Sequence, residues 1–191
     1  MKSQTLRRLF ATQLVLLAIA LVALFKPAID PAIAGSGQVK VAYGEDDLPE
    51  PVQEMRQAIM DAAVTGDLEA MRIPIELNEL APTISEGPIV DAIRYWQKNS
   101  SDGTGREILA ILLDLLDTGY VRVMTGGESA MYVWPYFAET SLKDLSPAQQ
   151  VELYRVASPA DVRRMREKGR YTGYRIGIGE DGVWHDFVKN E

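Results

Sequence analysis

Residues 106–117 read "REILAILLDLLD" and are the most apolar stretch of the chain after its N-terminal segment. In a helix, their isoleucine and leucine side chains would cover nearly the whole circumference, and only a narrow stripe through Arg106, Asp114 and Asp117 would stay polar. A helix that is apolar almost all round is a buried one. We therefore expect residues 106–117 to form the central helix of the core.

Further helices are expected on both sides of this one. Apolar residues at helical spacing predict helices over residues 51–64 and 89–98. Two more are expected to begin at Ser146 and Ser158, because each serine precedes a proline, and this pair suits the N-cap and first turn. The second of them continues as "DVRRMREKG" (161–169), whose cations in the last turn suit the helix dipole.

Strands are expected in two pairs. Residues 120–124 and 130–136 are rich in β-branched and aromatic side chains and flank the turn residues "TGGES". The chain closes in "YRIGIGEDGVWHDFVKNE" (174–191), a hairpin around "EDG". Because helices and strands come in blocks rather than in alternation, we expect an α+β domain. Its N-terminal helices would pack on a small antiparallel sheet of about four strands that ends in the C-terminal hairpin.

The face on which His185 lies depends on the length of the hairpin turn. A two-residue turn sets His185 opposite Ile178, whereas a three-residue turn with Gly182 left-handed sets Trp184 opposite Ile178. Both turns are common. The three-residue turn is favoured because it buries the indole, which is the larger apolar body.

The N-terminal segment has the pattern of an export signal. The basic stretch "MKSQTLRR" precedes residues 9–25, which carry no charge, and "AIA" (32–34) follows ahead of Gly35. We expect a signal peptide over residues 1–34, cleaved after Ala34, then a linker over 35–47 and a single α+β domain over 48–191. The alternative is an uncleaved inner-membrane anchor, since 17 apolar residues reach the lower limit for spanning a bilayer.

The composition excludes several kinds of site. The chain has 191 residues, one histidine, no cysteine and a net charge of −7. Disulfides, thiolate catalysis and multi-histidine metal sites are therefore excluded, and we expect no metal and no cofactor. Loss of residues 1–34 removes four cations and one acid, which leaves 16 basic and 26 acidic residues and a net charge of −10. Such a chain has no basic footprint for nucleic acid, and only an uncleaved N-terminal segment would bind a membrane.

Aromatic residues are the first candidates for a binding site. They gather in the expected second strand and in the hairpin, at Tyr132, Trp134, Tyr136 and Trp184. If these strands share a sheet, rings with polar tips suit the recognition of a peptide or glycan at a concave surface. The alternative is ordinary packing in the core and across strands.

Ionisable residues are the second candidates. Glu76 and Glu79 lie beside apolar residues, where burial would raise the pKa of a carboxyl group, and His185 is the only imidazole. Any of them, or Asp114, could act as a base if a second polar group lay within hydrogen-bond reach. The sequence shows no serine or carboxylate bound to His185, so a structural or exposed histidine is favoured.

Two resemblances add to these expectations. The segments "YVWPYFAE" (132–139) and "GRYTGYRIGIGEDGVWHDFVKN" (169–190) resemble those of a family of uncharacterised small exported bacterial proteins, which implies export. An opening helix followed by "GDLEAM" (66–71), with a closing "EDGVW" (180–184), is similar to the cone-shaped NTF2-like fold. The two helices expected over 146–168 depart from the usual element order of that fold, which hosts many functions.

These patterns together favour an exported protein that is not an enzyme. We expect a periplasmic or secreted binding or interaction domain whose partner is a peptide, glycan or protein of the cell envelope. One alternative is a periplasmic hydrolase or isomerase that uses a carboxylate or His185 as base. The other is a membrane-anchored structural protein.

Overall fold

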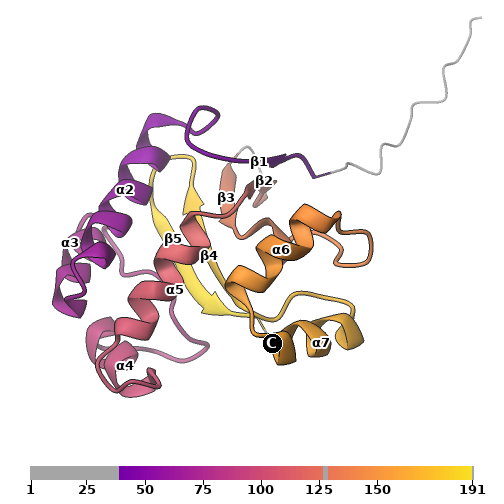
Figure 1. Ribbon diagram of the computed structural model, residues 1–191. Coiled ribbons are helices and arrows are strands. Elements are labelled where there is room, and N and C mark those ends of the chain that lie inside the picture. Colours follow the sequence, from indigo (N-terminus) through magenta and orange to yellow (C-terminus); the bar gives the residue numbers. More distant parts are fainter. Residues whose placement is uncertain (1–38, 127–128, 191) are drawn as a thin grey trace, which may run out of the picture. The chain divides into compact units, whose positions relative to one another are not determined.

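An antiparallel sheet lies at the centre of the fold and has the strand order β1-β2-β3-β4-β5 (Figure 1). The computed structural model describes residues 39–126 and 129–190, so the expected signal peptide lies outside the described residues. The strands are β1 (Val41–Ala42), β2 (Tyr120–Met124), β3 (Ala130–Trp134), β4 (Tyr174–Gly179) and β5 (Trp184–Lys189). The predicted α+β class and the closing hairpin are confirmed, and the short strand β1 adds a fifth member to the expected four.

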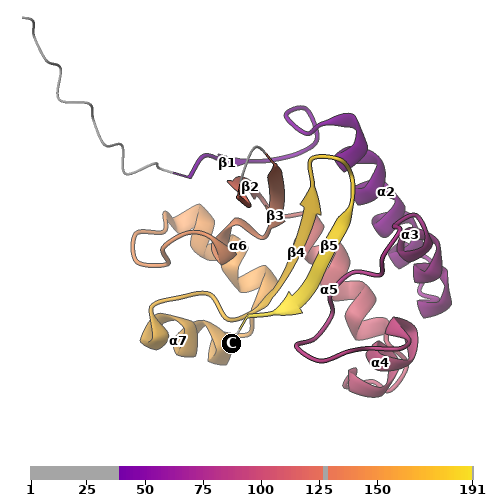
Figure 2. The same cartoon turned by 180° about the vertical axis from the view of Figure 1, so that it is seen from behind.

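Helices surround this sheet. They are α2 (Glu50–Val64), α3 (Arg72–Glu76), α4 (Ala92–Asn99), α5 (Arg106–Leu116), α6 (Pro147–Val156) and α7 (Pro159–Lys168), with 3-10 turns η1 (Leu68–Met71) and η2 (Tyr136–Ala138). In Figure 1, α5 crosses in front of β4 and β5, and from behind the hairpin lies in front of α5 (Figure 2). Within the described residues, no helix is long and apolar enough to cross a bilayer.

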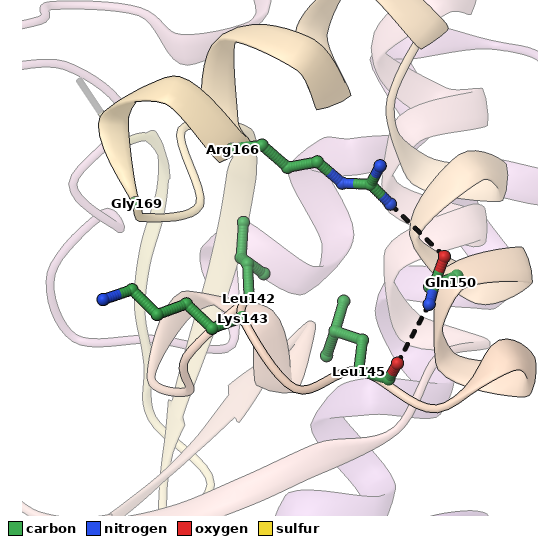
Figure 3. Close-up of a pocket in the computed structure, with 6 residues that line it drawn as sticks. All are labelled: Leu142, Lys143, Leu145, Gln150, Arg166 and Gly169. Carbon is green, nitrogen blue, oxygen red and sulfur yellow. Dashed lines mark hydrogen bonds between the residues drawn. The ribbon is translucent and has the colours of Figure 1, made fainter.

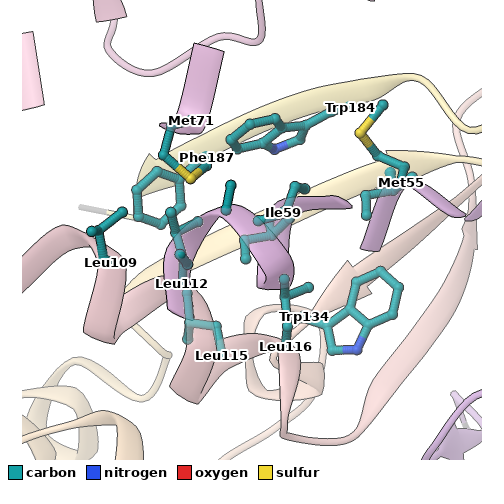
Figure 4. Packing of buried hydrophobic residues seen from close by; sticks show 14 of the residues in the cluster. Met55, Ile59, Met71, Leu109, Leu112, Leu115, Leu116, Trp134, Trp184 and Phe187 are labelled. Atoms are coloured by element: carbon teal, nitrogen blue, oxygen red, sulfur yellow. The ribbon is translucent and has the colours of Figure 1, made fainter. Parts of the chain in front are cut away.

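Helix α5 forms the middle of the main core, as its apolar circumference predicts. Ile108, Leu109, Leu112, Leu115 and Leu116 are buried, and they pack with α2 and with one face of the sheet (Figure 4). Apolar side chains at each turn of α2 complete this layer. Burial of these side chains is the main stabilising contribution to the fold.

A second, smaller core lies between the other face of the sheet and helices α6 and α7. Val121 and Val133 point to this face and pack with Leu153, Val162 and Met165. The expected helix starts are confirmed, because the hydroxyl of Ser146 accepts from the backbone N–H of Gln149 and that of Ser158 from Asp161. These caps satisfy backbone donors that a helix N-terminus otherwise leaves unpaired.

The segment before α2, assigned by the sequence to the end of a linker, contacts the domain. Val41 pairs with Val121, and the Glu45 carboxylate forms an ion pair with Arg56. Arg56 is buried and donates from Nη2 to the carbonyl oxygen of Leu116 at 2.9 Å. The C-terminus of α5 is thus capped by a side chain that also holds the entering segment.

The closing hairpin has the three-residue turn that the sequence favours. The backbone N–H of Gly179 donates to the carbonyl oxygen of Val183 at 2.8 Å, and Gly182 is left-handed with φ +86°. Trp184 therefore lies opposite Ile178. The register then shifts, so that Gly177 pairs with Asp186, and His185 is the extra residue of a β-bulge.

Candidate functional site

The aromatic residues expected to line a recognition surface are core residues instead. Tyr132, Trp134, Tyr136 and Trp184 are each at most 5% exposed. Tyr132, Trp134 and Trp184 pack in the main core, where α2, α4 and α5 cover their face of the sheet, and Figure 4 shows the two indoles among leucine and methionine side chains. The surface role predicted for them is wrong, because their large apolar rings are the side chains that the helices cover.

Tyr136 belongs to a polar clamp at the border of the smaller core. Its hydroxyl donates to Oε2 of Glu152 at 3.0 Å, and so does the hydroxyl of Tyr43. The backbone N–H of Gly119 donates to Oε1 of the same carboxylate at 2.9 Å. Burial raises the pKa of Tyr136 far above its ordinary value, so its hydroxyl keeps its proton. The clamp ties α6 to the segments around β1 and β2.

The ionisable candidates lie apart on the surface. Glu76, Glu79, Asp114 and His185 are all exposed. Across residues 39–126 and 129–190, no hydrogen bond or ion pair joins any of these four side chains to another group. The imidazole of His185 lies over Gly179, where its Nε2 is 2.8 Å from the position a Cβ would take. Oδ1 of Asp181 approaches the same position, yet no hydrogen bond or ion pair between the two side chains is found among the described residues. The bonded pair of polar groups that acid–base catalysis uses is therefore not formed at these four side chains.

A hollow lies elsewhere, between α6, the end of α7 and the segment that precedes α6. Its volume is about 400 Å³. It is lined by Leu142, Lys143, Leu145, Gln150, Arg166 and Gly169, and we call it the basic groove (Figure 3). This volume lies within the range typical of ligand sites.

The groove combines two leucine side chains with two cations. In Figure 3, Leu142 lies between Lys143 and Arg166, and Leu145 lies below Gln150. The Lys143 side chain extends away from α6, whereas Arg166 extends towards α6. There its Nη2 donates to Oε1 of Gln150 at 3.3 Å, while Nε2 of Gln150 donates to the carbonyl oxygen of Leu145 at 3.0 Å. Because the partner of Arg166 is a neutral amide, its charge is not compensated.

Acidic partners are unevenly distributed among the basic side chains. The ion pairs of the described residues use these other basic side chains: Lys40, Arg56, Arg72, Arg94, Arg122, Arg155, Arg164 and Arg175. Within residues 39–126 and 129–190, no carboxylate pairs with Lys143 or Arg166 of the groove, or with Arg163, Lys168 and Arg170 of α7 and the residues after it. The groove lining thus carries two unpaired cations in a chain whose net charge is negative.

Sequence reasoning missed this site, although one signal for it was present. Helix α7 buries Val162 and Met165 on its apolar face, so its cations point outward. We interpreted these cations only as partners of the helix dipole. Lys143 and the two leucines come from a separate irregular segment, and no sequence spacing predicts that this segment folds beside α7.

Comparisons with protein-family models, with curated proteins and with solved structures find no match for this chain. The resemblances of residues 132–139 and 169–190 to exported bacterial proteins, and of the "GDLEAM" and "EDGVW" segments to the NTF2-like fold, remain predictions. The functional conclusion therefore rests on the chemistry of the surface.

Proposed function

We propose that the protein is an exported, non-enzymatic binding domain of the cell envelope that holds an acidic segment of a protein partner in the basic groove. The observation that carries this proposal is that two cations without a carboxylate partner, Lys143 and Arg166, line one groove together with Leu142 and Leu145. Each cation can form a charge-assisted hydrogen bond with a carboxylate, and Leu142 and Leu145 can take an apolar side chain of the same segment.

A short segment fits this charge distribution better than an extended anionic surface. A peptide touches the groove alone, whereas a membrane or a nucleic acid would also approach the acidic remainder of the molecule. The mature chain would carry a net charge of −10, and charges repel over about 8–10 Å at physiological salt. This supports a peptide or protein partner.

Export is supported by the N-terminal sequence. A basic stretch, an apolar run over residues 9–25 and "AIA" at 32–34 favour cleavage after Ala34 and a periplasmic or secreted protein. The rival proposal is an inner-membrane anchor over residues 9–25 on a structural protein. Cell fractionation with mass determination of the mature N-terminus distinguishes them, because retention of residues 1–34 in the membrane fraction would show an anchor.

The enzymatic alternative has less support from the structure. A hydrolase or isomerase would need Glu76, Glu79 or His185 hydrogen-bonded to a second polar group, and among the described residues no hydrogen bond or ion pair involves these three side chains. No sequence motif supplies a complete catalytic set either. We therefore favour binding over catalysis.

The proposal is tested by titrating the protein with a hexapeptide of four glutamates and two leucines. Loss of a charge-assisted bond costs about 1.5–3 kcal/mol, so Lys143→Glu with Arg166→Glu should weaken binding at least about tenfold. The matched control is Lys98→Glu with Arg106→Glu, which changes the net charge equally at two exposed cations outside the groove. Equal weakening by both double variants would contradict a site in the groove.

A further inference from the structure

A second surface, distant from the basic groove in sequence, exposes apolar side chains. It spans residues 73–90, from α3 to the segment before α4. Leu80 is 82% exposed and Val90 is 105% exposed, and other large apolar side chains of this stretch also reach solvent: Ile73, Leu77 and Ile89. A concentration of exposed apolar area on a soluble domain marks an interaction surface.

Two of these side chains, Ile89 and Val90, line a cleft of about 170 Å³, and the other three come from the same stretch of chain. It is lined by Arg72, Ile75, Ala81, Pro82, Ile84, Ile89, Val90, Asp91, Ala92 and Ile93. Eight of these ten are apolar, and the other two form an ion pair at 3.2 Å. The floor of the cleft is thus apolar, and the two charged residues of its lining neutralise each other. We call it, with its exposed neighbours, the apolar cleft.

Acidic residues alternate in the sequence with those that line the apolar cleft. Glu76, Glu79 and Glu86 are exposed, and no basic side chain of the described residues pairs with them. The two basic residues nearby in sequence, Arg72 and Arg94, are both paired with Asp91. The three glutamates therefore carry negative charge that no described residue compensates, and its sign is opposite to that of the basic groove.

The backbone beneath this surface is held in place by the closing hairpin. The N–H of Thr83 donates to the carbonyl oxygen of His185 at 2.9 Å, and the N–H of Phe187 donates to the carbonyl oxygen of Thr83 at 2.8 Å. Asn78 accepts from the N–H of Trp184 at 3.0 Å. A surface that is already ordered loses little conformational entropy on binding.

We infer that the apolar cleft docks a basic amphipathic segment of a partner protein. Apolar side chains on one face of the segment would enter the cleft beside Ile89 and Val90. Lysine or arginine side chains at its edges would lie against Glu76, Glu79 and Glu86. This arrangement is the helix-in-groove mode of peptide recognition with complementary charge at its rim.

A second copy of the chain supplies such a segment poorly. The most basic helix, α7, is amphipathic, but its apolar residues Val162 and Met165 are buried in the smaller core. Only its charged face is available to another molecule. Docking of α7 would leave the apolar floor of the cleft uncovered, so a separate partner fits the surface better.

The test uses the full chain and a 14-residue amphipathic peptide of leucine and lysine, followed by fluorescence anisotropy. We expect this peptide to bind, and a serine–lysine peptide of equal charge to bind at least tenfold more weakly. Equal binding of the serine–lysine peptide would overturn the inference, because charge alone would then explain it. Failure of the leucine–lysine peptide to bind would overturn it as well.

Variants locate the binding. Leu80→Asp with Val90→Asp should weaken binding of the leucine–lysine peptide at least tenfold, whereas Val64→Asp with Val151→Asp, at two other exposed positions, should change it less than about threefold. Glu76→Lys with Glu79→Lys should weaken it more than Glu54→Lys with Asp61→Lys, which alters the net charge equally on the exposed face of α2. Equal effects of a test pair and its control would overturn the inference.

Two further measurements complete the test. Thermal unfolding of each variant should match that of the unaltered chain, because the substituted residues are exposed. Sedimentation should show a monomer. Self-association that Leu80→Asp with Val90→Asp abolishes would overturn the inference in favour of a second copy as the occupant. None of these outcomes depends on the basic groove, so this inference can fail independently of the proposed function.

Discussion

Trp184 and Phe187 pack on the same side of the sheet, although residues three apart in a regular strand point to opposite sides. Both rings contact Trp96 of α4, with ring centroids 6.2 Å and 5.8 Å from it. The bulge at His185 makes this possible, because it inserts one unpaired residue between them. The alternation of side chains is thereby shifted by one residue, and both rings lie on the same face of the sheet. The single histidine of the chain therefore has a structural place, and the core gains two large aromatic side chains.

This relationship predicts unequal effects of neighbouring substitutions. Trp184→Ala removes a fully buried indole and should lower the free energy of unfolding by about 3–5 kcal/mol. His185→Ala removes an exposed side chain and should change it by less than about 0.5 kcal/mol. Urea unfolding followed by tryptophan fluorescence measures both. A loss of several kcal/mol in His185→Ala would contradict the exposed and unpaired position assigned to this side chain.

Two buried tyrosines differ in whether their hydroxyl group has a partner. Tyr136→Phe removes a hydrogen bond to Glu152 and should cost about 1–2 kcal/mol. The Tyr120 hydroxyl is buried without a partner among the described residues, so Tyr120→Phe should be neutral or stabilising by up to about 1 kcal/mol. Chemical denaturation measures both variants, and each serves as the control for the other. A larger loss of unfolding free energy in Tyr120→Phe than in Tyr136→Phe would contradict the prediction.

Asp186 should make the stability depend on pH. Burial raises the pKa of its carboxyl group, and Arg175 at 3.1 Å offsets this only in part. The folded state therefore binds this proton more tightly than the unfolded state, whose pKa is about 3.9. As pH rises from that value through the folded-state pKa, ionisation of Asp186 removes stability.

Asp186→Asn abolishes this ionisation. The free energy of unfolding of this variant, relative to that of the unaltered chain, should therefore increase as pH rises from about 4 to 7. Asp114→Asn, at an exposed and unpaired position, is the control and should follow the unaltered chain at each pH. Parallel curves for Asp186→Asn and the unaltered chain would show that the carboxyl group is not perturbed.

Local signals in the sequence predict the main helices and strands, but they do not predict which helices cover each face of the sheet. The apolar circumference of residues 106–117 predicts a buried helix, and "EDG" with the size of the indole predicts the three-residue turn. Alternation along β3 predicts that Tyr132 and Trp134 share a face. It does not reveal that helices cover this face, because the covering residues, such as Trp96, are distant in the sequence.

The bulge and the basic groove were missed for a related reason. A one-residue bulge at His185 becomes favourable only when Trp96 and α4 offer a place for both Trp184 and Phe187. The groove needs Lys143 beside Arg166, two residues that the irregular segment before α6 brings together. Tertiary packing decides both features, and one-dimensional spacing does not carry that information.

Amide hydrogen exchange, with and without the glutamate–leucine hexapeptide, tests directly whether an acidic segment occupies the basic groove. Binding there should slow exchange in residues 142–150 and 163–170 and leave the segments around Lys98 and Arg106 unchanged. Lys143→Glu with Arg166→Glu should remove the slowing at the same peptide concentration. If the peptide binds but slows exchange only outside these two segments, the basic groove is not the site that holds it.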